Sequence, residues 1–510
     1  MNDSCGALDA LEADYEALAR RLGAATWLSY VGEEEGETAE DPAAVRAEFG
    51  RLFDRARPVL DACRGSGGDP IIARRAEVWR RCEGAWRLDA DPEAVRLRTD
   101  LERRVNEHAF VRGDRTWSRS DLSRLSRSDD PAERRLVVEL RGDLHGEVLE
   151  DTLRLVSLRK EAAAGLGGAG TYADAMLGAE GLPPELLDPL LRELDERTAE
   201  AWAEVLRRGR EAGGDPAATL APWDVPWLIE KLGTIPDERW PKEQALPALS
   251  ETLRGIGVEL EALPIRRREG DFGYGGQTLA VSIPDDVRMM INPLPGWRVW
   301  GTLFHETGHA LQGVSTTVAS PILKGYEWLA GASVPAYAEG MAELLGLLVG
   351  DRAFLERRTD LSTEEIERFL ALWRARSLVS VRSRLADVAL ERALYEEGTD
   401  VDAVEHEVAE RYLGLALPLD APATWAATAF LAAYPCYMQN YVLADLIAAQ
   451  VLRAVRERFG EGWLDDPAVG AFLREALWSD GETREWTVRV REATGEELSV
   501  EAYLEFVMGT

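Results

Sequence analysis

Two of the five histidines in this chain lie four residues apart, in the segment TLFHETGHAL at 302–311. Positions i and i+4 share one face of a helix, so His305 and His309 could bind the same metal ion. Glu306 would point about 100° further around the helix, where it could reach a water on the metal and act as a general base. This H-E-x-x-H pattern predicts a metal-dependent hydrolase.

A catalytic zinc site usually has three protein ligands and one open position. The remaining histidines lie far away, in charged helical contexts typical of surface or packing residues: His108, His145 and His406. The segment 333–351 instead offers Glu339 and Glu343, one helical turn apart among apolar residues after Pro335. Buried carboxylates need partners, so we assign Glu339 to the metal and Glu343 to the second N–H of a ligand histidine. The reverse assignment is the alternative, and Glu327 is a weaker candidate ligand.

The HETGH motif and the glutamate-bearing segment that follows it resemble the glutamate-liganded zincins, or gluzincins. Within that group the chain is similar to the M3 oligopeptidases and to the related M2, angiotensin-converting-enzyme-like peptidases, over about residues 150–455. Further matching segments are VSLRKEAAAGLGGAGTYADAML at 156–177, ALYEEG at 393–398, ERYLGL at 410–415 and AAYPCYMQNYVLADLIAAQV at 432–451. The resemblance implies two helical halves around a deep channel, and zinc-dependent hydrolysis of peptides.

Three tyrosines in the last of these segments, Tyr434, Tyr437 and Tyr441, are spaced three and four apart, which predicts a shared helix side. A neutral phenol can donate a hydrogen bond to the oxyanion of a tetrahedral intermediate. The resemblance implies that one tyrosine does so and another binds substrate. The M3 register favours Tyr434 and Tyr441, and the M2-like register Tyr434 and Tyr437. These families usually place a histidine nearby, but residues 425–433 contain none, and Gln439 is the nearest polar substitute.

A β-hairpin is predicted just before the motif, from TLAVSI at 278–283 and VRMMIN at 287–292 around a Pro-Asp turn. An edge strand beside a zinc helix can pair with an extended peptide. We therefore expect four strand residues to bind substrate: Leu279, Ala280, Val281 and Ser282.

Helical periodicity dominates the rest of the chain, so the predicted fold class is mainly α, with a small β element beside the zinc helix. Helices are expected over about 44–62, 92–112 and 132–165, from Pro184 to Gly213, from Trp297, and after the Ser362-x-x-Glu365 capping box. We divide the chain into an N-terminal helical region, 1–215, and a catalytic region, 216–510.

The composition excludes several other classes. Asp and Glu total 91 against 59 Lys and Arg, a net charge of −32, which disfavours nucleic acid and anionic membranes as partners. The four cysteines form no CxxC pair and suggest reduced thiols. The N-terminus lacks a secretory pattern, and the charge-free stretch 421–444 contains prolines and amides, so we interpret it as buried helix. These features predict a cytoplasmic protein.

The expected function is zinc-dependent hydrolysis of amide bonds in short peptides, of oligopeptidase or dipeptidyl carboxypeptidase type, with one Zn²⁺ per chain. One alternative is a dedicated zinc amide hydrolase acting on a small biosynthetic intermediate. The absence of the family histidine near residues 425–433 is consistent with this alternative. Another is a catalytically silent peptide-binding protein. The retained Glu306 argues against the silent protein, because a binding module needs no general base.

Overall fold

The computed structural model describes residues 2–32, 40–63, 69–167, 170–217, 219–233, 236–270, 272 and 275–509. Helices make up most of this chain, and one small sheet lies beside the predicted zinc helix, which confirms the predicted fold class. The first half contains α1 (Asn2–Val31), α2 (Pro42–Cys63), α3 (Pro70–Leu88), α4 (Pro92–Glu107), α5 (Arg119–Leu125), α6 (Pro131–Gly165), α7 (Tyr172–Ala179), α8 (Pro184–Ala212), α9 (Val225–Lys231) and α10 (Lys242–Gly255). The second half contains α11 (Trp297–Ser315), α12 (Pro335–Gly346), α13 (Arg352–Arg358), α14 (Thr363–Leu394), α15 (Val401–Leu413), α16 (Phe430–Ala433), α17 (Met438–Phe459), α18 (Pro467–Leu473), α19 (Trp486–Thr494) and α20 (Glu501–Met508).

Several helix boundaries follow from local signals that the sequence displays. Pro184, Trp297 and Pro335 begin α8, α11 and α12 as expected, and the Ser362 capping box forms at the start of α14. The helix predicted over 92–112 instead ends at Glu107. The chain then forms a two-stranded hairpin, β1 (Phe110–Arg112) and β2 (Arg115–Trp117), around a left-handed glycine.

The second sheet contains β3 (Ile265–Glu269), β4 (Gly276–Ser282) and β5 (Asp286–Ile291) in the order β3–β5–β4. The predicted hairpin is β4 and β5, which pair antiparallel, and β3 adds a parallel strand that the sequence did not suggest. β5 is central and almost wholly buried, and α11 packs against both β4 and β5. The sheet thereby fixes the position of the helix that carries the H-E-x-x-H motif.

Close helix packing brings the second predicted ligand segment to the first. α12 packs against both α11 and α17. A Cβ atom on Gly308 would lie 2.5 Å from Ala342 Cα, so only glycine allows α11 and α12 to approach this closely. Gly340 likewise lies against Ile447 of α17, where an added Cβ would meet its side chain at 2.9 Å.

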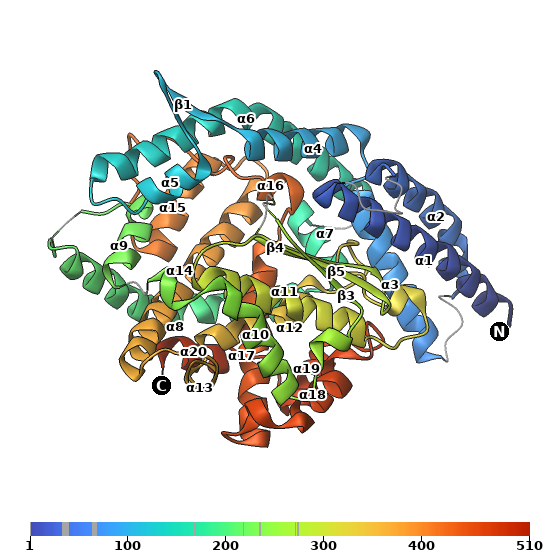
Figure 1. Cartoon of the computed structure of the whole chain (residues 1–510). Helices are drawn as coiled ribbons and strands as arrows, with labels where there is room; N and C mark the ends of the chain where they lie inside the picture. The colour runs from blue at the N-terminus through green and yellow to red at the C-terminus, as the bar shows by residue number, and fades with distance from the viewer. Residues whose placement is uncertain are drawn as a thin grey trace.

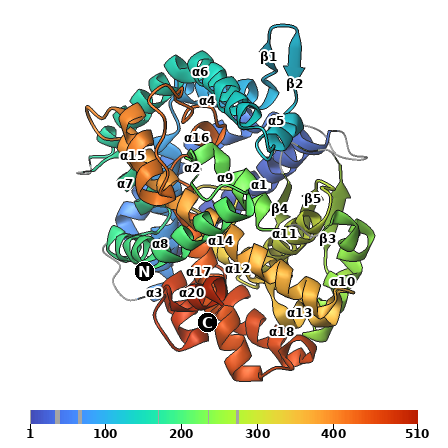
Figure 2. The same cartoon turned by 90° about the vertical axis from the view of Figure 1, so that its left-hand side faces the viewer.

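Figures 1 and 2 both place α4, α5 and α6 at the top of the molecule and α13, α18 and α20 at the bottom, with the sheet, α11 and α12 between them. One large apolar core joins α8 of the first half to α11, α12, α14 and α17 of the second half. The division at residue 215 and the deep channel both remain predictions.

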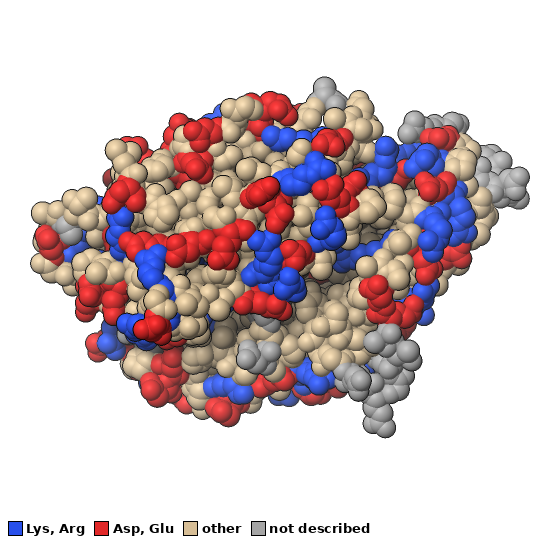
Figure 3. Space-filling view, turned by 90° about the horizontal axis from the view of Figure 1, so that it is seen from above, with Lys and Arg blue, Asp and Glu red and all other residues tan. Residues whose placement is uncertain are grey.

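Charged side chains of both signs are interspersed on the face shown in Figure 3. Ion pairs join two of the helices at the top of the molecule: Arg104 of α4 contacts Asp151 of α6 at 2.5 Å, and Arg154 of α6 contacts Glu93 of α4 at 2.7 Å. No helix among the described residues is long and apolar enough to cross a membrane.

Candidate metal centre

The three predicted ligands come together at the contact between α11 and α12. Glu339 Oε2 lies 3.3 Å from His305 Nε2 and 3.6 Å from His309 Nε2, and one ligand atom from each residue lies within 4.8 Å of the others. Zinc–ligand bonds of about 2.0–2.1 Å in a tetrahedral arrangement would place ligand atoms about 3.3 Å apart. Two imidazole nitrogens and one carboxylate oxygen at these separations therefore fit a zinc ion.

Each histidine is oriented by a second carboxylate on its other ring nitrogen. Glu343 Oε2 lies 3.1 Å from His305 Nδ1, and Glu327 Oε2 lies 2.8 Å from His309 Nδ1. A carboxylate at Nδ1 fixes the tautomer that leaves Nε2 available as a ligand, and it makes that nitrogen more basic. The geometry thus favours Glu339 over Glu343 as ligand, and it gives Glu327 the same supporting position as Glu343.

The carboxylates make this buried cluster strongly attractive to a cation. Burial disfavours a charged His305, but hydrogen bonds with Glu339 and Glu343 outweigh it and raise the histidine pKa to about 10. Burial also acts to raise the pKa of Glu339, but the hydrogen bonds from the two histidines hold that pKa well below its usual range. Both shifts show that the cluster stabilises positive charge next to Glu339.

Glu306 lies beside this cluster and is 7% exposed. The Thr278 hydroxyl donates to Glu306 Oε2 at 2.8 Å, which fixes the carboxylate on the sheet side of α11. A Cβ atom on Gly276 would lie 2.8 Å from Glu306 Cγ, so β4 passes the carboxylate at a position that only glycine fits. Burial raises the pKa of Glu306 above its usual value, as suits a proton acceptor.

The three tyrosines are neighbours, although they do not share one helix. The ring centroids of Tyr434 and Tyr437 are 5.8 Å apart, and those of Tyr437 and Tyr441 are 5.3 Å apart. The prediction that the three tyrosines share one side of a helix is wrong. α17 begins only at Met438, and a bend at Pro435 and Cys436 precedes it.

The tyrosine hydroxyls have different surroundings. Tyr437 donates to Glu339 Oε1 at 2.8 Å, and Tyr434 hydrogen-bonds with Tyr30 of α1. Burial, followed by the charge of Glu339, raises the pKa of Tyr441 well above its usual value, and Glu306 adds to the shift. The Tyr441 phenol is therefore neutral, and the charges of both carboxylates act on it.

Other predicted residues are not available to a substrate. Gln439 is 3% exposed and its amide donates to the Cys436 carbonyl, so it does not replace the missing histidine. In the predicted substrate segment, Leu279, Val281 and Ser282 are buried, and the carbonyl of Ala280 accepts from the Trp328 indole at 2.9 Å. The first three residues of β4, Gly276–Thr278, differ from this segment because they contact Glu306.

Sequence reasoning missed three residues around the site: Thr278 as a partner of Glu306, and Tyr30 and Arg46 near Tyr434. It named Glu327 only as a candidate metal ligand, whereas this carboxylate lies on His309 Nδ1. Burial raises the pKa of Tyr434 above its usual value, and the positive charge of the exposed Arg46 partly opposes this shift. Tyr30 and Arg46 belong to α1 and α2, about 400 residues before Tyr434. No local pattern in the sequence could have linked them.

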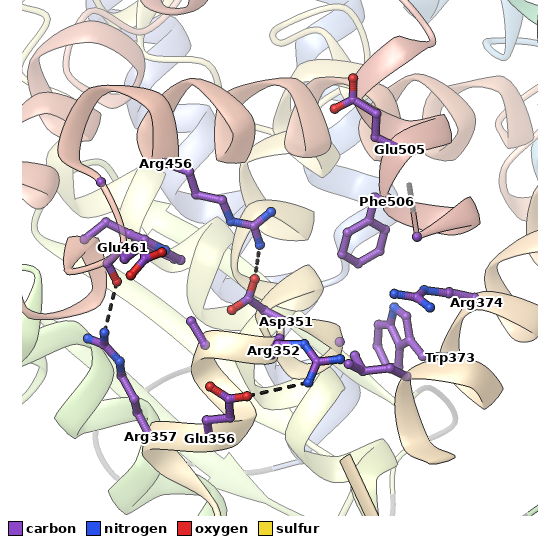
Figure 4. A pocket seen from close by; sticks show the side chains of 16 residues that line it. Asp351, Arg352, Glu356, Arg357, Trp373, Arg374, Arg456, Glu461, Glu505 and Phe506 are labelled. Carbon is purple, nitrogen blue, oxygen red and sulfur yellow. Dashed lines mark hydrogen bonds and ion pairs between the residues drawn. The ribbon is translucent and has the colours of Figure 1, made fainter. Parts of the chain in front are cut away.

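A cavity of about 680 Å³ lies elsewhere, between α13, α14, α20 and the end of α17 (Figure 4). Much of its charged lining is already paired: Arg456 contacts Asp351, and Arg352 lies 3.6 Å from Glu356. The predicted site residues are all outside this cavity, so its size does not make it the functional site.

Comparison with known proteins finds similarity at the level of the fold. No protein-family model and no curated protein matches the sequence. The solved structure of Pyrococcus furiosus carboxypeptidase, in an apo-Mg form, aligns over 100% of this chain and 99% of its own, at 15% identity and a TM-score of 0.69. The M32 carboxypeptidase from Deinococcus radiodurans R1 aligns over 99% and 98%, at 19% identity and a TM-score of 0.64. BsuCP aligns over 98% of both chains, at 16% identity and a TM-score of 0.59.

This chain therefore has the fold of these carboxypeptidases along its whole length. At such low identity the similarity establishes the fold and leaves the chemistry to the site itself. The comparisons give no support to the M3 or M2 family specifically, and the neighbour whose family is stated belongs to M32.

Proposed function

We propose that this protein is a zinc-dependent peptidase that removes residues from the C-terminus of peptides. The observation that carries the proposal is the cluster of His305, His309 and Glu339 with Glu306 beside it. The solved structures with this fold include carboxypeptidases from two organisms, which supports the carboxypeptidase mode over internal cleavage. A zinc ion in such a site supplies a Lewis acid that polarises a carbonyl and acidifies water.

The protein residues divide the remaining chemistry. Glu306 takes a proton from the attacking water and returns it to the leaving nitrogen, and Thr278 holds its carboxylate in place. Tyr441 is the better candidate for the oxyanion donor, because Tyr437 already donates to Glu339. Backbone groups of Gly276–Thr278 lie where an extended substrate could pair with β4 beside Glu306.

Selection of a free C-terminus would need a cation within reach of the site. Arg46 is exposed on α2, and its charge acts on both Tyr30 and Tyr434. Arginine binds carboxylates with paired N–H donors, so Arg46 is the residue we assign to the substrate carboxylate.

Hydrolysis of three forms of one peptide tests the proposal: the free acid, the C-terminal amide and the N-terminally acetylated acid. The zinc-loaded protein should shorten the free-acid peptide one residue at a time from its C-terminus. It should leave the C-terminally amidated form intact, and N-terminal acetylation should make little difference. Internal cleavage of the amidated peptide would instead indicate an oligopeptidase. No cleavage of any form by protein containing stoichiometric zinc would refute the peptidase proposal.

A further inference from the structure

The turn that separates Tyr434 from Tyr437 has a backbone that its sequence does not favour. Cys436 has φ +55°, a left-handed conformation that residues with a Cβ rarely adopt, and it is buried. α16 ends at Ala433 and α17 begins at Met438, so neither helix imposes this conformation. Strained backbone of this kind persists only where the surrounding structure holds it, and it concentrates at functional sites.

Two buried charged residues from distant helices hold this turn. Glu391 of α14 accepts from the Cys436 backbone N–H at 3.0 Å and also from the Tyr437 N–H. Arg159 of α6 donates to the carbonyls of Leu431 and Ala432 at 2.7 and 2.6 Å. The turn is thus clamped on both sides of the strained residue.

Three of the four segments given above for the resemblance, at 156–177, 393–398 and 432–451, meet at this turn. Arg159 lies in the 156–177 segment, and its guanidinium also reaches the Tyr395 hydroxyl, 3.4 Å away in the 393–398 segment. Tyr172 of the first segment packs on Tyr395 with ring centroids 4.6 Å apart. Three separate stretches therefore converge on the turn, and none of these residues belongs to the metal cluster.

The turn is connected to the metal cluster through Tyr437, which follows Cys436 and donates to Glu339 Oε1 at 2.8 Å. We propose that Glu391 and Arg159 are positioning residues: they hold the strained turn so that Tyr437 stays on Glu339 and fixes the orientation of that carboxylate. The inference rests on the proposed zinc site. It adds that part of the site's geometry is set by α6 and α14.

A double-mutant cycle between Glu391→Leu and Tyr437→Phe tests this connection. Glu391→Leu removes the acceptor, and we expect kcat to fall about 10- to 100-fold, as for other residues that orient metal ligands, with little change in KM. Glu391→Gln keeps an acceptor oxygen and should retain most of the activity. Because the proposed effect passes through Tyr437, Glu391→Leu should lower kcat less than about 3-fold when it is introduced into the Tyr437→Phe variant. Two fully additive losses would overturn the proposal.

The absorption spectrum of the cobalt-substituted protein provides a readout independent of activity. Glu391→Leu and Tyr437→Phe should shift the cobalt bands in the same way, whereas the exposed control Glu397→Leu should leave them unchanged. A wild-type cobalt spectrum in Glu391→Leu, with lowered thermal stability alone, would make Glu391 merely structural. If the protein cleaves no peptide yet these shifts occur, the proposed function fails and the positioning proposal stands.

Cys436→Gly covers the case in which Glu391→Leu does not fold. Glycine adopts φ +55° without strain, so this variant should fold, and the backbone contacts from Glu391 and Arg159 remain. We therefore expect a kcat and a cobalt spectrum close to those of the wild type. A lowered kcat with a changed cobalt spectrum would mean that the Cys436 side chain sets the turn, and would overturn the proposal.

Discussion

Replacing Glu327 by Gln should weaken zinc binding about 10-fold, although this residue does not contact the metal position. Its carboxylate lies 2.8 Å from His309 Nδ1, and Gln keeps an acceptor oxygen but removes the negative charge. A hydrogen bond to a charged group contributes about 1.5–3 kcal/mol, against about 0.5–1.5 for a neutral one. The two ranges differ by about 1–1.5 kcal/mol, which corresponds to a factor of roughly ten in Kd. Glu343 hydrogen-bonds with His305 Nδ1 at 3.1 Å and supports the other histidine, so Glu343→Gln should weaken zinc binding by a similar factor.

Competition for zinc against a chelator of known affinity would measure both constants. Glu356→Gln is a matched control, since it removes the same charge from a side chain that is 52% exposed and pairs with Arg352. The double variant of Glu327 and Glu343 should lose about 100-fold, because the two carboxylates act on different histidines. If neither single variant differed from the Glu356→Gln control, the carboxylates would not support the ligands and the reasoning would be refuted.

Three further predictions concern separate parts of the molecule. Glu306→Gln should keep its zinc and lose at least about 10²-fold in kcat, measured with zinc content on the same sample; full activity would exclude Glu306 as the base. Arg46→Ala should raise KM for free-acid peptides about 10-fold at similar kcat, and an unchanged KM would remove Arg46 from substrate binding. Burial raises the pKa of Glu180 to about 8, so the folded state holds a proton that the unfolded state releases near pH 4.5. The free energy of unfolding gains the full contribution of this proton below pH 4.5 and loses it as pH rises to about 8. In urea titrations, Glu180→Gln should therefore flatten the decline of the unfolding free energy by about 1.4 kcal/mol per pH unit. An identical pH dependence in the two proteins would contradict the assignment.

The sequence was sufficient for those parts of the site that depend on local periodicity. His305 and His309 share a helix face because their spacing demands it, and α12 begins at Pro335 as its backbone preference suggests. The choice between Glu339 and Glu343 required the approach of α11 to α12. That approach depends on Gly308, and the sequence alone does not show that a glycine inside a helix faces another helix.

Residues whose positions depend on distant contacts could not be inferred. The regular spacing of Tyr434, Tyr437 and Tyr441 suggested one helix, but Pro435 interrupts it. Contacts from Arg159 and Glu391 then stabilise a turn in which Cys436 has φ +55°. Similarly, α1 and Trp328 cover the part of β4 with the clearest strand pattern. The strand β3 was missed because its sequence, IRRRE, is highly charged, and its partners on β5 lie about 20 residues further along the chain, where Asp286 contacts Arg266 at 2.9 Å.

The most direct test of the central claim is the metal content of the purified wild-type protein and of Glu339→Ala, measured side by side by elemental analysis. We expect one zinc per chain in the wild type and its loss in the variant, because two histidines alone leave the site without its third ligand. A wild type that holds no metal even after zinc is supplied, or a variant that retains its full zinc, would contradict the claim.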